Sequence, residues 1–343
     1  MSTVVGDALT ALSTGRDLAR AESTALFTAI MSGEATPAQI GGVLIALKLK
    51  GETVDEIAGA VEAMRSLATP VRVTTNHLVD TCGTGGSGTS KLFNISTAAA
   101  FVAAATGAHV AKHGNRGMTS KSGSADVLEA AGVRIDLTPQ QIARCIAQIG
   151  VGFMFAPAHH GAMKHAAGVR RELGVRTIFN LLGPLTNPAQ ASNQVIGVAD
   201  AGWLRKLAEV LRTLGSRHVL LASSDGLDEI SIAAPTSVAE LVDGDIREYT
   251  IAASEFGMAE RPLTALRADS PTASLALVME SLTKPESAAA DIVALNAGAA
   301  IYTAGVATTL ANGVAMAQDA IAAGLAKEKL DELVRVTKLM VGG

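Results

Sequence analysis

Short apolar runs alternate with longer stretches of helical spacing from residue 78 to residue 222. The runs have the length of β-strands, and the stretches between them are long enough to be helices. Strands that alternate with helices favour a mostly parallel sheet with helices on its faces. We expect strands at 78–82, 108–111, 151–156, 194–199 and 218–222, and helices at 96–106, 122–131, 139–149 and 201–214.

The first 68 residues contain only helical spacing, and the apolar positions recur at 18–31, 40–49 and 57–67. Thr36 with Gln39, and Thr53 with Glu56, have the spacing of capping boxes and mark two helix starts. Near the other end, Asp243-Gly244 between two apolar runs predicts a β-hairpin, and the chain is helical again from 287.

These patterns predict an α/β protein with a small all-helical N-terminal domain. The basic stretch 164–186 interrupts the α/β alternation, and we expect it to pack onto the N-terminal helices. The expected domains are 1–70 together with this stretch, and an α/β domain formed by 71–163 and 187–343.

Composition restricts the partners and the location. The net charge is −4 and aromatic residues make up only 3% of the chain, which argues against non-specific nucleic-acid binding. The uncharged stretches 92–111 and 292–318 contain Asn and Gly, so we expect buried helices there and no contact with a membrane. Cys82 and Cys145 are typical of reduced thiols, which favours the cytoplasm.

A glycine-rich segment follows the first predicted strand, reading Asp80-Thr-Cys-Gly-Thr-Gly-Gly-Ser-Gly-Thr89, and leads into a helix near Ser96. Glycines let backbone N–H groups approach an anion, and a helix N-terminus adds partial positive charge. The segment is neither a P-loop nor a GxGxxG fingerprint. It predicts a cradle for phosphate or pyrophosphate, although a plain glycine turn is the alternative.

Two further segments follow strands of the same predicted sheet. Lys112-His-Gly-Asn-Arg116 leads to serines at 122 and 124, and a second phosphate loop there would face the same crevice. Asp228 and Glu229 follow the strand at 218–222 and suit Mg²⁺, which binds one or two carboxylates together with substrate phosphates. An ordinary acidic turn is the alternative for this pair.

The stretch 157–188 is rich in histidine, lysine and arginine, and arginine can bind a carboxylate with two hydrogen bonds. Zinc is disfavoured there because no cysteine or carboxylate has a convincing ligand spacing. Phosphates, Mg²⁺ and an organic anion are therefore expected to meet between the helical and α/β domains. That combination describes transfer of a phosphorylated group onto a small acid.

Six segments in this order resemble the anthranilate phosphoribosyltransferases of tryptophan biosynthesis, and the resemblance covers nearly the whole chain. They are Gly83-Thr-Gly-Gly86, Asn94-Ile-Ser-Thr97, Lys112-His-Gly-Asn-Arg116, Ser122-Gly-Ser-Ala-Asp126, 176–188 and Asp228-Glu229. The resemblance implies the nucleoside-phosphorylase-like fold and a homodimer formed through the helical domains. It also implies 5-phosphoribosyl 1-pyrophosphate (PRPP) as donor, Mg²⁺ as cofactor and anthranilate as acceptor.

The resemblance also implies roles for individual residues. Lys112, Asn115 and Arg170 would be catalytic, Ser96, Asp228 and Glu229 would bind Mg²⁺, and Arg170 would lie nearest the anthranilate carboxylate. PRPP would contact Gly83, Thr84, Gly85, Gly86, Ser87, Asn94, Ser96, Thr97, Lys112 and Ser124. Anthranilate would contact Gly83, Asn115, His160, Arg170 and Pro184. No covalent enzyme intermediate and no essential general base are expected.

One position departs from the family pattern, because Ser87 stands where Asp usually follows the Gly-Thr-Gly-Gly segment. This change puts PRPP affinity and Mg²⁺ dependence in doubt more than the type of reaction. Two alternatives are a pyrimidine nucleoside phosphorylase of related fold and a non-catalytic paralogue that binds nucleic acid. The Lys112–Arg116 segment argues against the first, and the acidic net charge argues against the second.

Overall fold

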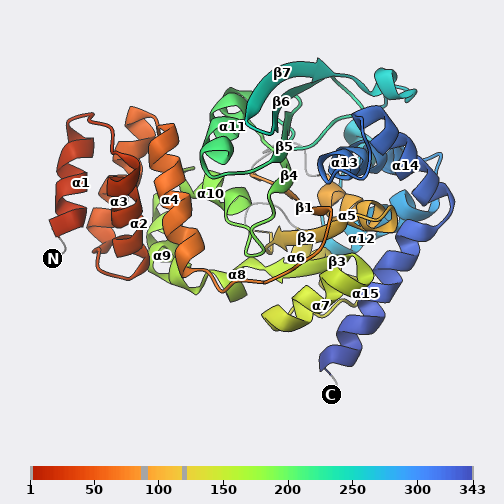
Figure 1. The fold of residues 1–343 in the computed structure, drawn as a ribbon, viewed down its shortest axis with the longest axis horizontal. Helices are drawn as coiled ribbons and strands as arrows, with labels where there is room; N and C mark the ends of the chain where they lie inside the picture. Colours follow the sequence, from red (N-terminus) through yellow and green to blue (C-terminus); the bar gives the residue numbers. More distant parts are fainter. Residues whose placement is uncertain (1–2, 86–91, 118–121, 342–343) are drawn as a thin grey trace.

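The computed structural model describes residues 3–85, 92–117 and 122–341. Its first four helices lie together at one end of the molecule (Figure 1), as the N-terminal spacing predicts. Thr36 and Thr53 form the two predicted capping boxes. The helices are α1 (Thr3–Ser13), which the spacing did not predict, α2 (Arg20–Met31), α3 (Pro37–Lys50) and α4 (Val54–Leu67).

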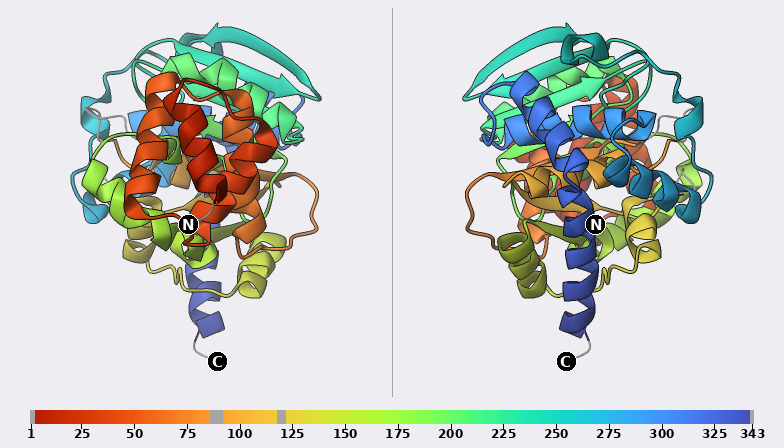
Figure 2. Two further views of the ribbon diagram at one scale, coloured as in Figure 1. Left: turned by 90° about the vertical axis from the view of Figure 1, so that its left-hand side faces the viewer. Right: turned by 90° about the vertical axis from the view of Figure 1, so that its right-hand side faces the viewer.

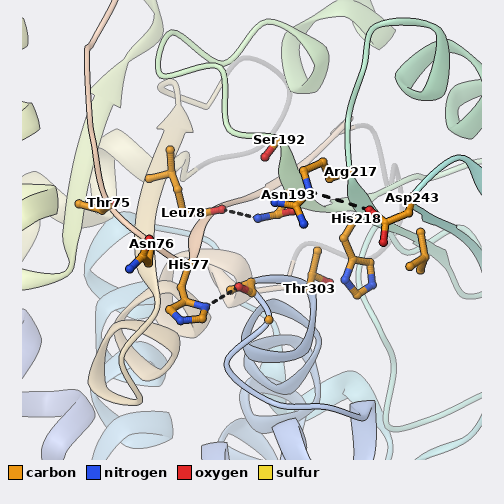
Figure 3. Close-up of a pocket in the computed structure, with 13 residues that line it drawn as sticks. Thr75, Asn76, His77, Leu78, Ser192, Asn193, Arg217, His218, Asp243 and Thr303 are labelled. Carbon is orange, nitrogen blue, oxygen red and sulfur yellow. Dashed lines mark hydrogen bonds and ion pairs between the residues drawn. The ribbon is translucent and has the colours of Figure 1, made fainter.

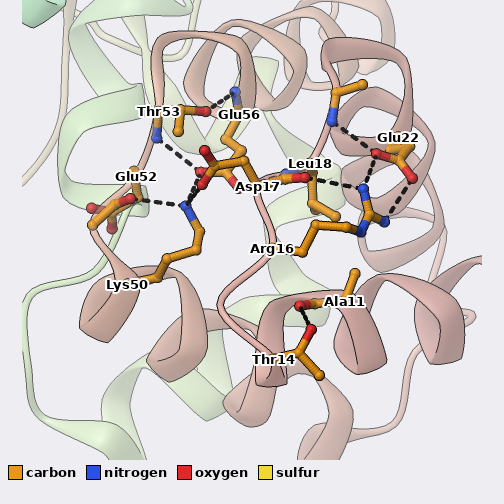
Figure 4. A network of polar contacts seen from close by, with 12 residues as sticks. Ala11, Thr14, Arg16, Asp17, Leu18, Glu22, Lys50, Glu52, Thr53 and Glu56 are labelled. Carbon is orange, nitrogen blue, oxygen red and sulfur yellow. Dashed lines mark hydrogen bonds and ion pairs between the residues drawn. The ribbon is translucent and has the colours of Figure 1, made fainter.

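A buried carboxylate joins these helices through a polar network (Figure 4). The Glu56 side chain is fully buried and accepts hydrogen bonds from the backbone N–H groups of Leu18 and Thr53, at 2.9 and 2.8 Å. The Lys50 ammonium lies 2.9 Å from Glu56 and 2.7 Å from Asp17. A buried carboxylate is costly unless it is paired and hydrogen-bonded, and both conditions are met here.

The central sheet has seven strands in the order β3-β2-β1-β4-β5-β6-β7. The first five are parallel and the last two are antiparallel, which confirms the predicted mostly parallel sheet. The predicted hairpin turn lies at Asp243-Gly244, and both residues have positive φ. The strands are β1 (Leu78–Gly83), β2 (His109–Gly114), β3 (Val151–Phe155), β4 (Asn193–Gly197), β5 (His218–Ser223), β6 (Thr236–Val242) and β7 (Asp245–Ile251).

Both faces of the sheet are buried, and alternate strand residues enter different cores. Val195 and Leu220 belong to one core, whereas Ile196 and Leu221 belong to the other. The first core is covered by α5 (Ile95–Ala105), α6 (Ser124–Ala130), α7 (Pro139–Ile149), α12 (Pro271–Thr283), α13 (Ala288–Thr303), α14 (Leu310–Ala322) and α15 (Leu325–Val341).

The second core joins the sheet to the N-terminal helices through α11 (Leu204–Thr213) and the segment after β3. That segment contains α8 (Ala156–His159), α9 (Lys164–Leu173) and α10 (Phe179–Leu185). α9 contacts α2 and α3, and α10 contacts α4, where Arg65 Nε donates to the Leu185 carbonyl at 2.9 Å. Figure 2 shows the N-terminal helices grouped in front of the sheet in its left view.

Of the two long uncharged stretches, 92–111 is largely buried, whereas the predicted burial of 292–318 holds for α13 and is wrong for α14, which has an exposed face. Residues 92–111 contain α5 and the start of β2, and residues 292–318 contain most of α13 and part of α14. Within the described ranges, no helix has both the length and the apolar character needed to span a bilayer.

Candidate active site

Most of the predicted PRPP and Mg²⁺ residues lie at the carboxyl ends of the parallel strands or in the segments just after them, whereas Arg170 and Pro184 lie in α9 and α10. β1 lies between β2 and β4. The strands that follow β1 in the sequence are added first on one side of it, as β2 and β3, and then on its other side, beginning with β4, so the strand order reverses at β1. Ligands of open α/β sheets bind outside the strand ends at such a switch point. Gly83 ends β1 and pairs with Gly197, which ends β4.

Asp228 packs closely against the glycines that end β1 and β4. A Cβ atom at Gly83 would lie 2.5 Å from Asp228 Oδ2, and one at Gly197 would overlap the Asp228 backbone. The N–H of Gly85 donates to Asp228 Oδ2 at 2.9 Å. Asp228 therefore lies against two strand ends that need glycine, beside the glycine-rich segment predicted to bind phosphate.

Glu229, Ser96 and Lys112 meet beside Asp228. Ser96 N–H, at the start of α5, donates to Glu229 Oε1 at 3.3 Å, and Lys112 Nζ donates to Ser96 Oγ at 3.3 Å. Burial, followed by the neighbouring Asp228 charge, raises the pKa of Glu229 to about 8. A divalent cation beside these oxygen atoms would favour the ionised carboxylate.

Lys112 lies inside a strand, whereas the sequence placed it in a loop after one. β2 continues through Gly114, and the Lys112 side chain is buried, with Nζ donating to the Thr81 carbonyl at 2.6 Å. The fully buried Asp80 lies on the neighbouring strand and its Oδ1 accepts from His113 N–H. The charge of Asp80 partly offsets the effect of burial, which lowers the pKa of Lys112.

The second predicted phosphate loop folds back toward the first. Asn94 Oδ1 accepts hydrogen bonds from Ser122 Oγ at 2.9 Å and from Ser274 Oγ at 2.7 Å. Ser124 Oγ donates to the Asn115 carbonyl at 3.3 Å. The structure thus places Ser124, predicted to bind PRPP, directly beside Asn115, predicted to bind anthranilate.

The histidines on the predicted acceptor side are neutral near pH 7. Burial lowers the pKa of His160 to about 4 and that of His113 to about 3, and each is lowered further by neighbouring histidines. Their rings meet edge to face with centroids 5.1 Å apart. In the described structure the Nε2 atoms of both residues are buried without a hydrogen-bond partner.

Arg170 is a half-buried cation on α9, and no ion pair holds it within the described ranges. Its guanidinium lies over the Phe179 ring, 5.1 Å from the centroid. Pro184 lies in α10 and its carbonyl accepts from Gln194 Nε2. An arginine without a carboxylate partner remains able to bind one from a substrate.

Some predictions are left open. Gly86 and Ser87 lie outside the described residues, and the buried Thr97 hydroxyl has no hydrogen-bond partner among the described residues. Thr84 holds the strand ends together, because its N–H donates to the Gly197 carbonyl at 2.9 Å.

Two residues without a predicted role also contact the site. Arg176 donates to the Gly85 carbonyl at 3.0 Å, and Asp126 holds the base of the second loop. Asp126 ends the segment 122–126 and Arg176 begins the segment 176–188, so the family resemblance was the feature of the sequence that could have pointed to both residues.

A pocket of about 480 Å³ lies at the opposite edge of the sheet, where β1, β4 and β5 begin (Figure 3). Its two charged residues, Arg217 and Asp243, face each other with Nε and Oδ1 3.9 Å apart. His77 Nδ1 hydrogen-bonds the Ala304 carbonyl at the end of α13. None of the predicted substrate residues lines this pocket.

Comparison with known proteins identifies the family. Residues 6–68 match the family described as glycosyl transferase family, helical bundle domain, and residues 75–327 match its a/b domain. The anthranilate phosphoribosyltransferase of Thioalkalivibrio sulfidiphilus is 59% identical over 322 residues, which cover 94% of this chain and 95% of that protein. The enzyme of Cellvibrio japonicus is 55% identical over 98% of this chain and 99% of its own length.

Solved structures agree with these relatives. The crystal structure of anthranilate phosphoribosyltransferase from Thermus thermophilus has a TM-score of 0.91 and 43% identity, covering 97% of this chain and 99% of that one. The Saccharomyces cerevisiae enzyme, solved in complex with PRPP and Mg, has a TM-score of 0.87 at 22% identity, covering 98% and 99% of the two chains. The chain therefore belongs to the anthranilate phosphoribosyltransferase family.

Proposed function

We propose that this enzyme transfers the 5-phosphoribosyl group of PRPP to the amine of anthranilate, releasing pyrophosphate, in tryptophan biosynthesis. The observation that carries this function is 59% identity to an anthranilate phosphoribosyltransferase over 94% of the chain. The full-length match also disfavours a nucleoside phosphorylase and a nucleic-acid-binding paralogue.

The PRPP site that we propose spans the two loops at the carboxyl edge of the sheet. The described contributors are Gly83, Thr84, Gly85, Asn94, Ser96, Thr97, Lys112 and Ser124, and we add Gly86 and Ser87 from the sequence. The contacts among Asn94, Ser122, Ser124 and Asn115 support this grouping because they bring both loops together. Backbone N–H groups at the start of α5 suit a pyrophosphate.

The residues beside the PRPP site fit Mg²⁺. Asp228, Glu229 and Ser96 supply only oxygen donors, which this hard cation prefers. Asp228 and Glu229 lie close together, and burial and the Asp228 charge disfavour ionisation of Glu229, so a divalent cation would offset the repulsion between the two carboxylates. We propose that Asp228, Glu229 and Ser96 hold Mg²⁺, which when bound would neutralise the leaving pyrophosphate.

Anthranilate would lie between the α/β edge and α9, near Asn115, His160, Arg170 and Pro184, with Gly83 at its boundary with PRPP. Arg170 would bind the carboxylate, since it has a free guanidinium face. His160 is uncharged at neutral pH, so it would not compete with Arg170 as a second cation.

Chemistry at this site needs positioning more than proton transfer. The neutral aromatic amine attacks the anomeric carbon of ribose while the C–O bond to pyrophosphate breaks, through an oxocarbenium-like transition state. Lys112 would stabilise the leaving group, and Asn115 and Arg170 would align the amine. Alignment and charge neutralisation can supply most of the rate enhancement, so no covalent intermediate or general base is required.

We also propose a cytoplasmic homodimer that pairs through the helical domain, with domains at 1–70 plus 164–186, and at 71–163 plus 187–343. Exposed apolar side chains on these helices support the pairing, and Leu49 is 80% exposed. The two cysteines are free and buried, which is consistent with a reducing compartment.

The test is the loss of anthranilate fluorescence in the presence of PRPP and Mg²⁺, with each component omitted in turn. We expect a loss of fluorescence that requires both PRPP and Mg²⁺. A folded protein that binds PRPP but consumes no anthranilate would contradict the proposed reaction. Release of base from thymidine with inorganic phosphate would favour the phosphorylase instead.

A further inference from the structure

We propose that Asp126 is a positioning residue that fixes Asn115 and Ser124 relative to each other and so aligns the two substrates. It lies in the first turn of α6 and is not among the residues proposed to contact either substrate. The inference rests on the proposed roles of Asn115 and Ser124 in binding anthranilate and PRPP.

One carboxylate oxygen of Asp126 ties together two points of the second loop. Asp126 Oδ2 accepts the N–H of Gly117 at 2.9 Å and the N–H of Gly123 at 2.8 Å. Gly117 follows Asn115 by two residues and Gly123 precedes Ser124. A single side chain therefore sets the distance between the two predicted substrate segments.

The backbone is unusually close at the same place. A Cβ atom at Gly123 would overlap Gly117 N and the carbonyl groups of Arg116 and Asn115. The Asn115 carbonyl accepts from Ala125 N–H at 3.2 Å and from Ser124 Oγ at 3.3 Å. The two segments at the base of the loop are thus in direct backbone contact, and the hydrogen bonds from Gly117 and Gly123 to Asp126 join them at the same place.

Arg116 reinforces this arrangement from outside the loop base. Its guanidinium pairs with Asp126 Oδ1 at 3.2 Å and with both oxygens of Glu129, and it lies over the Phe155 ring, 5.4 Å from the centroid. Glu129 makes no contact with Gly117 or Gly123 in the described structure. Asp126 and Glu129 therefore separate two effects, because both bind Arg116 but only Asp126 binds the loop backbone.

Two variants of Asp126 test the proposal. Asp126→Asn keeps an oxygen that can accept from Gly117 and Gly123 but loses the charge toward Arg116, whereas Asp126→Ala loses both. We expect the alanine variant to raise KM for both PRPP and anthranilate and to lower kcat/KM roughly 100-fold, since a misplacement near 1 Å can cost that much. The asparagine variant should recover part of this loss.

The controls are Glu129→Gln, which weakens only the contact with Arg116, and Asp136→Asn, which breaks an exposed pair with Arg134 away from the loop. Both should retain KM values within about twofold, as expected for exposed ion pairs. Melting temperatures would be measured for every variant. A purely structural role for Asp126 would lower the melting temperature and the active fraction while leaving both KM values unchanged, and that result would overturn the proposal.

The proposed substrate site is tested separately with Asn115→Ala and Ser124→Ala. If these raise KM for anthranilate and PRPP respectively while Asp126→Asn and Asp126→Ala do not, Asp126 has no positioning role and the site assignment stands. If neither changes KM, the site assignment fails and this inference fails with it. Should the alanine variant not fold, Asp126→Asn decides the question, because a neutral amide oxygen accepts more weakly than a carboxylate from Gly117 and Gly123. Both KM values should then rise beyond the twofold limit set for Glu129→Gln, and equal effects of the two variants would overturn the proposal.

Discussion

Asp228 should be sensitive to single methyl groups on the strands behind it. In Gly83→Ala, the added Cβ would lie 2.5 Å from Asp228 Oδ2, whereas ordinary contact begins at 3.4 Å. The carboxylate must therefore retreat by about 0.9 Å, the difference between these distances. Its 2.9 Å hydrogen bond from Gly85 could lengthen to about 3.8 Å, which is too long for a hydrogen bond.

Gly197→Ala moves Asp228 from another direction, because the added methyl would overlap the Asp228 backbone. Gly197 is not among the proposed substrate contacts, so this variant separates a metal effect from a direct substrate effect. For both variants we expect a higher Mg²⁺ concentration at half-maximal rate and roughly 100-fold lower kcat/KM. The added atom should also destabilise the fold by about 1–3 kcal/mol.

The assay is the initial rate of anthranilate fluorescence loss over a range of Mg²⁺ concentrations at saturating PRPP, together with urea unfolding. Gly6→Ala is the control, since nothing lies within 4 Å of a Cβ atom there. A folded Gly197→Ala enzyme with unchanged Mg²⁺ dependence would show that the position of Asp228 does not govern metal binding.

Three further results are expected. Arg170→Ala should raise KM for anthranilate far more than KM for PRPP. An equal rise in both KM values would contradict the assignment of Arg170 to the anthranilate side of the site. As the pH falls from 6.5 to 4, His160 should become protonated in the unfolded chain but stay neutral in the folded protein. The free energy of unfolding should therefore decrease as the pH is lowered, by about 2 kcal/mol at pH 5 from this residue. Urea unfolding of His160→Gln should show a correspondingly smaller fall, and an unchanged slope would exclude His160 as its cause. Leu49→Lys should yield a monomer in light scattering, whereas Leu339→Lys on α15, another exposed leucine, should not; equal masses would place the dimer interface elsewhere.

Periodicity predicted the positions of the parallel strands well, because buried parallel strands are short, apolar and separated by helices. The hairpin was equally clear, since Asp243-Gly244 supplies the two positive φ angles that its turn requires. α12 was missed, although Ser270 caps it and Pro271 begins it, which is a readable start signal. α1 was missed because the spacing was followed only from residue 18.

Contacts between segments that are distant in the sequence were beyond prediction. The sequence suggested a phosphate cradle and an acidic pair, but not that Gly85 donates to Asp228, which lies far along the chain. The family resemblance includes Asp126 in one of its segments, but an acidic residue in the first turn of a helix is common, so its contacts could not be predicted. Only the fold shows that this carboxylate reaches back to Gly117 and Gly123.

Lys112 shows in physical terms why local pattern failed at the centre of the site. A lysine after an apolar run normally marks the end of a strand, because burying an ammonium is costly. Here β2 continues because the Thr81 carbonyl and Ser96 hydroxyl accept from Nζ, and the buried Asp80 lies on the next strand. None of these partners is local in sequence, so the cost of burying Lys112 is offset only after β1, β2 and α5 have assembled. Such an arrangement is a poor choice for stability alone, since apolar residues could fill the same space. Its position beside Ser96 and Glu229 is instead what a site for a charged leaving group requires, and this favours a catalytic reason for the buried lysine.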